Sequence, residues 1–341
     1  MMQVKVGLGL LSLALSALLV TAGVAATPRE PVIDMHIHAE AADSEGPPGQ
    51  YICTPYPAWK PMDPGRGGVG AYLDSMFGAP DCPRKVKGAM TDDELRGRTI
   101  EMLKKYDVYA IAGGGPKTVE RWRQEAPDRI MPALGASSPE NLPSLDKVRQ
   151  LYAEGKVKAL MELTFQYNGI SPADPRMEPY WALAEELDIP VGIHMGPGAP
   201  GITYFAAPNY RASLSDPLLL EPVLVAHPKL RIFVVHAGWP MKERMIALMY
   251  AHPQVYAEIG ILAGVYPDQD FYPYLKGLID AGFEDRILYG SDQMVWPDLV
   301  GVGIERVRNA PVLTPAQKRK ILYGNASRFL RIDPAGIGGK P

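Results

Sequence analysis

Cysteine is scarce in this sequence, because its 341 residues include only two. Two cysteines cannot build a disulfide-rich scaffold or a cysteine-rich zinc module. The chain also lacks an excess of either charge, since 35 Lys and Arg residues stand against 38 Asp and Glu residues, a net charge of −3. Without a basic excess, nucleic acid is excluded as the expected partner. Beyond residue 26 no apolar run reaches the roughly 20 residues of a membrane span, so we expect no membrane partner for the mature chain.

The first 26 residues have the pattern of a secretory signal. Lys5 supplies a positive start, residues 6–20 are almost wholly apolar, and mostly small residues fill positions 21–26. This order predicts a signal peptide cleaved after Ala26, and hence a periplasmic or secreted protein. An uncleaved N-terminal anchor is the alternative, although the apolar run is short for a membrane span. Residues 27–341 are expected to form a single domain.

Apolar, β-branched segments alternate with helix-patterned segments in the rest of the chain. Eight segments have the pattern of buried parallel strands: 32–36, 108–112, 130–134, 157–163, 190–194, 231–236, 255–259 and 287–292. Helix-patterned segments cover residues 91–106, 145–154, 178–187, 217–226, 241–251, 271–281 and 314–330. The alternation predicts an α/β fold, a (β/α)8 TIM barrel, with a doubly wound open sheet as the rival. The glycines after the second strand lack the dinucleotide-binding spacing.

A long segment, residues 46–83, interrupts this alternation after the first strand. It is rich in proline and glycine and shows little periodicity. We expect it to be a loop insertion near the barrel mouth, where it caps the site or only packs. Cys53 and Cys82 both lie in it. In an exported chain we expect them to pair, closing a loop that stabilises the fold by roughly 3–4 kcal/mol; two free thiols are the alternative.

Four of the six histidines fall at the C-terminal ends of predicted strands, and so does one aspartate. They are His36, His38, His194, His236 and Asp292. In a barrel this rim is where active sites form. The two histidines of the first strand are two residues apart, so both side chains can point into the mouth. Imidazole and carboxylate ligands from several strands suit a divalent metal, zinc by default.

The other two histidines are predicted to be structural. His227 and His252 each precede a proline at the end of a predicted helix. A histidine there interacts favourably with the helix C-terminus, and the proline ends the helix.

Five motifs in this order give the sequence its resemblance to the amidohydrolase superfamily. They are Asp34-Met35-His36-Ile37-His38, Pro190-Val191-Gly192-Ile193-His194, Val234-Val235-His236-Ala237-Gly238, Tyr289-Gly290-Ser291-Asp292 and Ile321-Leu322-Tyr323-Gly324-Asn325-Ala326-Ser327-Arg328-Phe329. The sequence is most similar to the amidohydrolase-related branch, amidohydrolase family 2. That branch holds metal-dependent hydrolases and nonoxidative decarboxylases of the aminocarboxymuconate-semialdehyde type.

The resemblance implies a role for each of these residues. His36, His38 and His194 would bind the metal, zinc first and manganese second. Asp292 would be a further ligand and the general base, and His236 would orient the attacking water or polarise the substrate. The family also implies a homodimer.

One residue departs from the family pattern. Glu162, in Ala159-Leu160-Met161-Glu162-Leu163, stands where binuclear members carry a carbamylated lysine that bridges two metals. Glu162 is therefore predicted either to bridge to a second metal or to orient a ligand histidine as a neighbouring carboxylate.

Three functions remain open at this stage. The first is a metal-dependent hydrolase that acts on an ester, lactone, amide or related bond of a small-molecule substrate. The second is a nonoxidative decarboxylase of an aromatic or unsaturated acid, which needs a cationic clamp such as Arg176 or Arg211. The third is a non-catalytic binding protein, which predicts gaps in a ligand set that is here complete. Export favours hydrolysis.

Some weaker candidates lie elsewhere on the predicted rim. Glu258 could bond the substrate or face a helix. A wall for an apolar pocket could come from four aromatic residues, Tyr204, Phe205, Tyr289 and Trp296.

Overall fold

The structure is a computed structural model that describes residues 1–2 and 30–332. The predicted signal segment and cleavage site lie almost wholly outside the described residues. Within the described part of the chain, no helix has the length and hydropathy needed to cross a bilayer.

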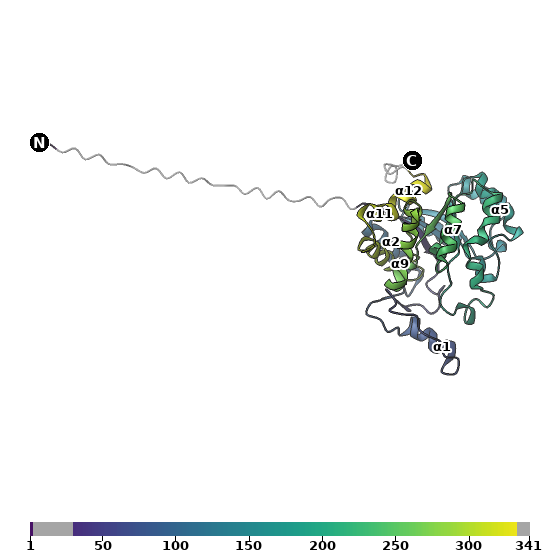
Figure 1. Cartoon of the computed structure of the whole chain (residues 1–341), viewed down its shortest axis with the longest axis horizontal. Helices are drawn as coiled ribbons and strands as arrows, with labels where there is room; N and C mark the ends of the chain where they lie inside the picture. The colour runs from purple at the N-terminus through teal and green to yellow at the C-terminus, as the bar shows by residue number, and fades with distance from the viewer. Residues whose placement is uncertain (3–29, 333–341) are drawn as a thin grey trace. The chain divides into compact units, whose positions relative to one another are not determined.

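Eight parallel strands form a nearly closed barrel, which confirms the predicted (β/α)8 fold (Figure 1). Neighbouring strands follow the chain order, so the doubly wound alternative is wrong. The strands are β1 (Val32–Ala39), β4 (Val108–Gly114), β5 (Ile130–Ala136), β6 (Ala159–Leu163), β7 (Val191–His194), β8 (Ile232–Val235), β9 (Val255–Glu258) and β10 (Ile287–Leu288). The last strand meets the first, because the Met35 amide donates to the Tyr289 carbonyl at 2.9 Å and the Asp292 amide to the His36 carbonyl at 2.9 Å.

Helices cover the outside of the barrel. They are α2 (Asp92–Tyr106), α3 (Pro116–Glu125), α4 (Leu145–Ala153), α5 (Glu178–Glu186), α6 (Glu221–Ala226), α7 (Lys242–Ala251), α8 (Leu262–Val265), α9 (Asp268–Leu278), α10 (Leu299–Arg308), α11 (Pro315–Arg319) and α12 (Asn325–Leu330). The predicted closing helix, 314–330, is divided by a π-helical turn between α11 and α12. At the start of α2, the Thr91 hydroxyl accepts from the Glu94 amide, and the Glu94 carboxylate accepts from the Met90 amide.

Among these helices, α3, α10 and the short α8 have no counterpart in the sequence prediction. Helix α3 buries only Val119 and Trp122, so its apolar stripe is too sparse to read as a pattern. Helix α10 contains Gly301 and Gly303, which lower helix propensity. A Cβ at either glycine would lie 2.7 Å from a tyrosine ring or hydroxyl, so these glycines are needed for close packing.

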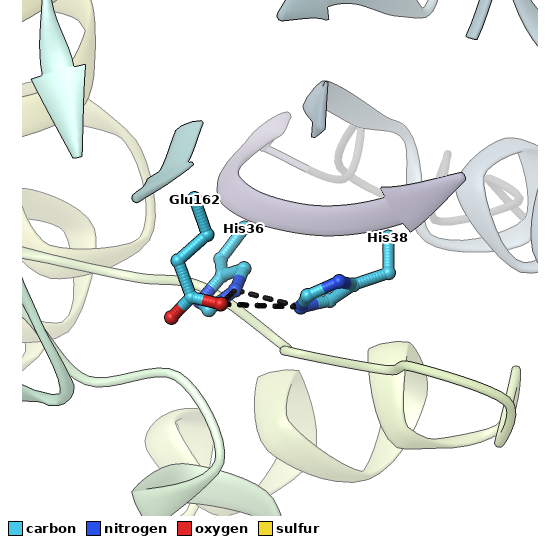
Figure 2. Close-up of side chains that lie close together, drawn as sticks. All are labelled: His36, His38 and Glu162. Atoms are coloured by element: carbon cyan, nitrogen blue, oxygen red, sulfur yellow. Dashed lines mark hydrogen bonds and ion pairs between the residues drawn. The ribbon is translucent and has the colours of Figure 1, made fainter. Parts of the chain in front are cut away.

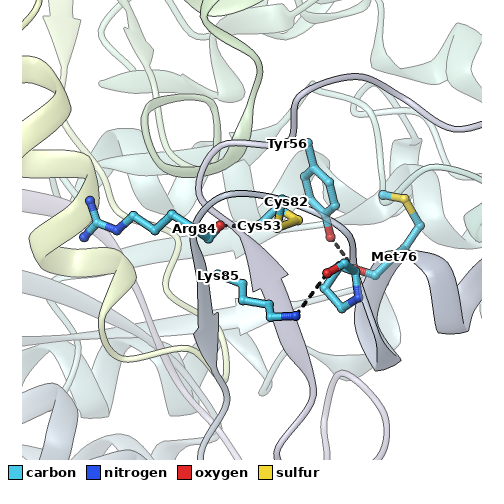
Figure 3. Close-up of a disulfide and its surroundings, with 7 residues drawn as sticks. Cys53, Tyr56, Met76, Cys82, Arg84 and Lys85 are labelled. Carbon is cyan, nitrogen blue, oxygen red and sulfur yellow. Dashed lines mark hydrogen bonds between the residues drawn. A yellow bond between two sulfur atoms is a disulfide. The ribbon is translucent and has the colours of Figure 1, made fainter.

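The insertion forms a small subdomain held to the loops at the mouth of the barrel. Strands β2 (Tyr51–Cys53) and β3 (Lys85–Lys87) pair antiparallel, and α1 (Gly68–Leu73) lies between them in the chain. Cys53 and Cys82 form a disulfide, which confirms their predicted pairing (Figure 3).

Contacts with three rim loops place this subdomain across the mouth. The Tyr56 amide donates to Val265, which follows β9, and the Trp296 indole after β10 donates to the Gln50 carbonyl at 2.9 Å. A Cβ at Gly201, after β7, would lie 3.3 Å from the Tyr72 ring. The insertion therefore borders the mouth, and whether it caps the site or only packs stays a prediction.

Candidate metal centre

Shifts of strand register place the polar side chains of the centre. In β1 the pairing shifts between Asp34 and Ile37. Met35, within the shift, belongs to the apolar cluster enclosed by the strands. Ile37, where the pairing resumes, belongs to the outer core. Alternation is interrupted, so Met35 and His36 both face inward. The inner methionine closes the barrel, and the histidine beside it lines the mouth.

Strand β6 repeats the same arrangement. Its pairing with β7 shifts between Leu160 and Leu163. Met161 joins the inner apolar cluster, and Glu162, the next residue, faces the histidines at the mouth. In both strands an inward methionine therefore lies directly below an inward polar residue.

The two histidines of β1 and Asp292 form one group of donor atoms. The Nε2 atoms of His36 and His38 are 2.9 Å apart (Figure 2). Oδ1 of Asp292 lies 2.9 Å from the His38 Nε2 and 3.5 Å from the His36 Nε2. Residues at opposite ends of the chain therefore meet at this point.

Glu162 lies between this group and a second one. Its Oε2 is 3.7 Å from the His36 Nε2 and 3.9 Å from the His38 Nε2. Its Oε1 is 3.5 Å from the His236 Nε2 and 3.9 Å from the His194 Nε2. One carboxylate oxygen thus faces each group of imidazoles.

The donor set fits a bound divalent cation. Two imidazole nitrogens at 2.9 Å need a proton or a cation between their lone pairs. Oε1 of Glu162 and Oδ1 of Asp292 are buried without a hydrogen-bond partner. Buried carboxylate oxygens of this kind are otherwise costly. His36, His38 and Glu162 form one candidate metal cluster, and Glu162, His194 and His236 form another.

The charges at the centre keep its carboxylates ionised. Burial alone would raise the pKa of Asp292, but His36 and His38 lower it to about 2. Burial likewise opposes ionisation of Glu162, yet His194 and His36 hold its pKa well below the ordinary value. For His38, neighbouring carboxylates outweigh burial and raise the pKa to about 9.

A second layer of polar groups fixes the ring orientations. The Nδ1 of His236 lies 3.0 Å from the Gly260 carbonyl, which can only accept. In neutral His236 the proton is therefore on Nδ1, and the Nε2 lone pair is free for a cation. Behind His194, the side-chain amide of Gln166 contacts Nδ1. Gln166 was not predicted from the sequence, because an isolated glutamine in a loop carries no pattern.

Glu258 and Asp34 complete this layer. Glu258 is 0% exposed and accepts from the Gly260 and His236 amides, so it does not lie at a substrate surface. One of its oxygens is 3.5 Å from the His36 Nδ1. Asp34 accepts from the His36 amide at 3.0 Å and the Ser291 amide at 2.9 Å, which joins β1 to the segment that carries Asp292.

The remaining predicted residues lie outside the centre. His227 and His252 follow α6 and α7 directly and face glutamates on the outer helices, as expected of structural histidines. Tyr289 is fully buried and donates to the Val300 carbonyl, so it does not line a pocket.

The aromatic residues and arginines predicted to form an apolar wall and a cationic clamp are not arranged in that way. Trp296 is buried and stacks on Phe77 of the insertion, while Tyr204 is 67% exposed; Phe205 is half-buried. Arg176 is paired with Asp174 and Glu140. The Arg211 guanidinium donates to two backbone carbonyls, those of Pro208 and Tyr210.

Solved structures with this fold include both hydrolases and decarboxylases. A 2,6-dihydroxybenzoate decarboxylase from Rhizobium matches with 13% identity over 89% of this chain and 99% of its own, at a TM-score of 0.53. A probable 2-pyrone-4,6-dicarboxylic acid hydrolase from Acinetobacter baumannii matches with 13% identity over 88% and 99%, at 0.53. An amidohydrolase from Burkholderia multivorans with bound zinc matches with 15% identity over 89% and 100%, at 0.53. At these identities the likeness shows the fold alone.

The sequence itself places the chain in a family. No curated protein matches it. The model of the family described as Amidohydrolase matches residues 33–332, which is nearly the whole described domain. The chain therefore belongs to the amidohydrolase family, whose members are generally metal-dependent enzymes.

Proposed function

We propose that this protein is an exported metal-dependent hydrolase that cleaves an ester, lactone, amide or related bond in a small molecule. The observation that carries the proposal is the position of Glu162, with one oxygen toward His36 and His38 and the other toward His194 and His236. Such an arrangement is suited to two neighbouring cations that share a carboxylate.

The residues of the centre divide between two metal positions. His36, His38, Asp292 and Glu162 would hold one ion, and His194 and His236 together with Glu162 would hold the other. Imidazole and carboxylate ligands favour zinc, with manganese as the second choice. Bound there, a divalent ion would polarise a substrate carbonyl and lower the pKa of water toward about 7.

Asp292 is ionised and placed to act as the general base. Its pKa of about 2 keeps it ionised at neutral pH, and its Oδ2 lies 3.8 Å from the His236 Nε2. The carboxylate could therefore accept the proton of an attacking water and pass it to the leaving group. The amide of Asp292 is bonded to His36 in β1, so the backbone holds its position.

The charge distribution favours hydrolysis over decarboxylation. A decarboxylase must hold a substrate carboxylate, typically with arginine. Within residues 30–332, the ion pairs of Glu162 and Asp292 all have histidine partners, and the two arginines predicted as a clamp are bonded elsewhere. These two arginines therefore form no clamp for a substrate carboxylate at the centre.

One assay series tests the proposal. Metal-free, zinc-loaded and manganese-loaded protein would be assayed with p-nitrophenyl acetate, γ-butyrolactone and N-acetylglycine, and with 2,6-dihydroxybenzoate for release of CO2. We expect metal-dependent hydrolysis that is lost in Asp292→Ala and kept in His252→Ala, a control at the C-terminal end of the outer helix α7. Release of CO2 without hydrolysis would identify a decarboxylase instead. Stoichiometric metal with neither reaction would favour a binding protein.

A further inference from the structure

Tyr167 places a phenol ring at the rim, in contact with His194 of the candidate metal centre. It belongs to a short 3-10 turn, Phe165–Asn168, that begins two residues after β6 ends. Its ring meets the His194 ring edge-on, with centroids 5.2 Å apart at 75°. The same ring lies 5.5 Å from that of Tyr210. Packing on two sides therefore fixes the position of the phenol.

A glycine in the loop after β7 leaves room for this ring. A Cβ at Gly198 would lie 3.0 Å from the Tyr167 hydroxyl oxygen and 3.2 Å from a ring carbon. Any larger residue would crowd the phenol, because contacts at that distance are already tight. The loop after β7 and the ring of Tyr167 therefore pack closely against each other.

The hydroxyl of Tyr167 is an unused donor. The hydroxyl makes no hydrogen bond to another residue in the range 30–332, and the residue is half-buried. The hydroxyl of the neighbouring Tyr210, in contrast, accepts from the Gly198 amide at 3.0 Å and lies 3.4 Å from the Ser215 hydroxyl. Of these two adjacent tyrosines, one is committed to the loop and the other is free to meet a ligand.

The surroundings keep this donor protonated. Burial raises the pKa of Tyr167 well above its usual value, and the charges of Glu162, Glu45 and Asp292 raise it further. These three carboxylates come from different parts of the rim, after β1, in β6 and after β10. The phenol is therefore neutral at neutral pH and can donate a hydrogen bond.

We propose that Tyr167 is a catalytic residue whose O–H donates a hydrogen bond to the substrate oxygen on which negative charge develops. A neutral donor fits this position because the site is rich in carboxylates. The two arginines predicted as a clamp, Arg176 and Arg211, are bonded elsewhere. Preorganised donors of this kind stabilise a developing oxyanion more than the uncharged carbonyl. The inference depends on the proposed hydrolysis for its role in turnover, but not for the contact itself.

The test compares Tyr167→Phe with Tyr210→Phe in zinc-loaded protein freed of excess metal. Methylphosphonate serves as the probe, because its tetrahedral oxygens carry the charge that the phenol should contact. Calorimetry should show at least about tenfold weaker binding for Tyr167→Phe. Tyr210→Phe should bind the probe as the wild type does, at some cost in thermal stability. Metal content should be unchanged in both variants.

Hydrolysis provides a second readout. With p-nitrophenyl acetate, Tyr167→Phe should lower kcat by about 10²-fold and leave KM within about twofold. Equal methylphosphonate affinity in wild type and Tyr167→Phe, or no binding to either, would overturn the proposal. A wild type that binds the probe through Tyr167 but hydrolyses nothing would instead refute the proposed function and leave this contact standing.

Discussion

At the scale of single residues, the centre depends on carboxylates that each serve two groups of histidines. Glu162 faces both groups with separate oxygens, and Asp292 contacts His38 with Oδ1 and His236 with Oδ2. A lysine at position 162 would need carbamylation to supply the same two oxygens. Glutamate supplies them directly, so the chain needs no modification there.

Replacement of Glu162 tests this double role. Glu162→Gln keeps the shape but supplies only one oxygen and no charge. We expect metal content to fall from about two ions per chain to one or fewer, with affinity for the remaining ion lowered at least about tenfold. Elemental analysis after dialysis measures both. Glu221→Gln, a half-buried carboxyl on α6, is the matched control. Two ions retained in Glu162→Gln would show that Glu162 only orients a histidine.

Metal binding should depend steeply on pH. The pKa of metal-free His38 is raised to about 9, so below pH 9 its imidazole is protonated. A metal must displace that proton, and the pKa of His36 is raised as well, so affinity should rise with pH by at least about tenfold per unit between pH 6 and 8. Competition with a chelator of known proton affinity measures this slope. Affinity independent of pH would mean that His38 is not a ligand.

At the scale of elements, two register shifts and one insertion make the site. The shifts in β1 and β6 turn His36 and Glu162 inward directly above an inward methionine. The insertion contacts the loops after β7, β9 and β10 and is closed by one disulfide. Strands therefore place the ligands, while the insertion borders the route to them.

Loss of the disulfide should affect access more than chemistry. Cys53→Ser with Cys82→Ser removes a cross-link between residues 29 apart in sequence. The chain-entropy estimate for such a loop is roughly 3–4 kcal/mol of stability. We expect KM to rise about fivefold or more through loosening of the mouth loops, with metal content kept. Thermal melting and steady-state kinetics check this, and reductant on the wild type should reproduce it. An unchanged KM would mean that the insertion only packs.

Prediction from sequence was most successful where a pattern is local. The spacing of His36 and His38 and the alternation of strands with helices were enough for the barrel and its rim. The register shifts were not predictable, because they depend on pairing with β4 and β7 rather than on the strand's own residues. For the same reason Asp34 and Gln166 were missed: each is defined by a partner far away in sequence.

At the scale of the whole molecule, the first and last strands complete the barrel together. Backbone bonds join Met35 to Tyr289 and His36 to Asp292, while Asp34 holds the Ser291 amide. These contacts place Asp292 beside His38. The backbone contacts that close the barrel therefore also hold the ligands of the metal centre beside one another.

Export is the proposal that concerns the chain as a whole. Expression of the full sequence in a Gram-negative host should yield a periplasmic protein that begins at Thr27. N-terminal sequencing and fractionation measure this. The control is Leu13→Arg, which keeps Lys5 but interrupts the apolar run and should therefore stay inside the cell. A membrane-bound product that still starts at Met1 or Met2 would favour an anchor.

Closure of β10 on β1 also sets when the metal can enter. The ribosome makes His36 about 250 residues before Asp292, so a growing chain holds an incomplete ligand set throughout synthesis. A chain that crosses the membrane unfolded, as proposed, would assemble the full set only on the far side. The ion in the finished enzyme would then reflect the metals available where the barrel closes, rather than those of the compartment where it is translated.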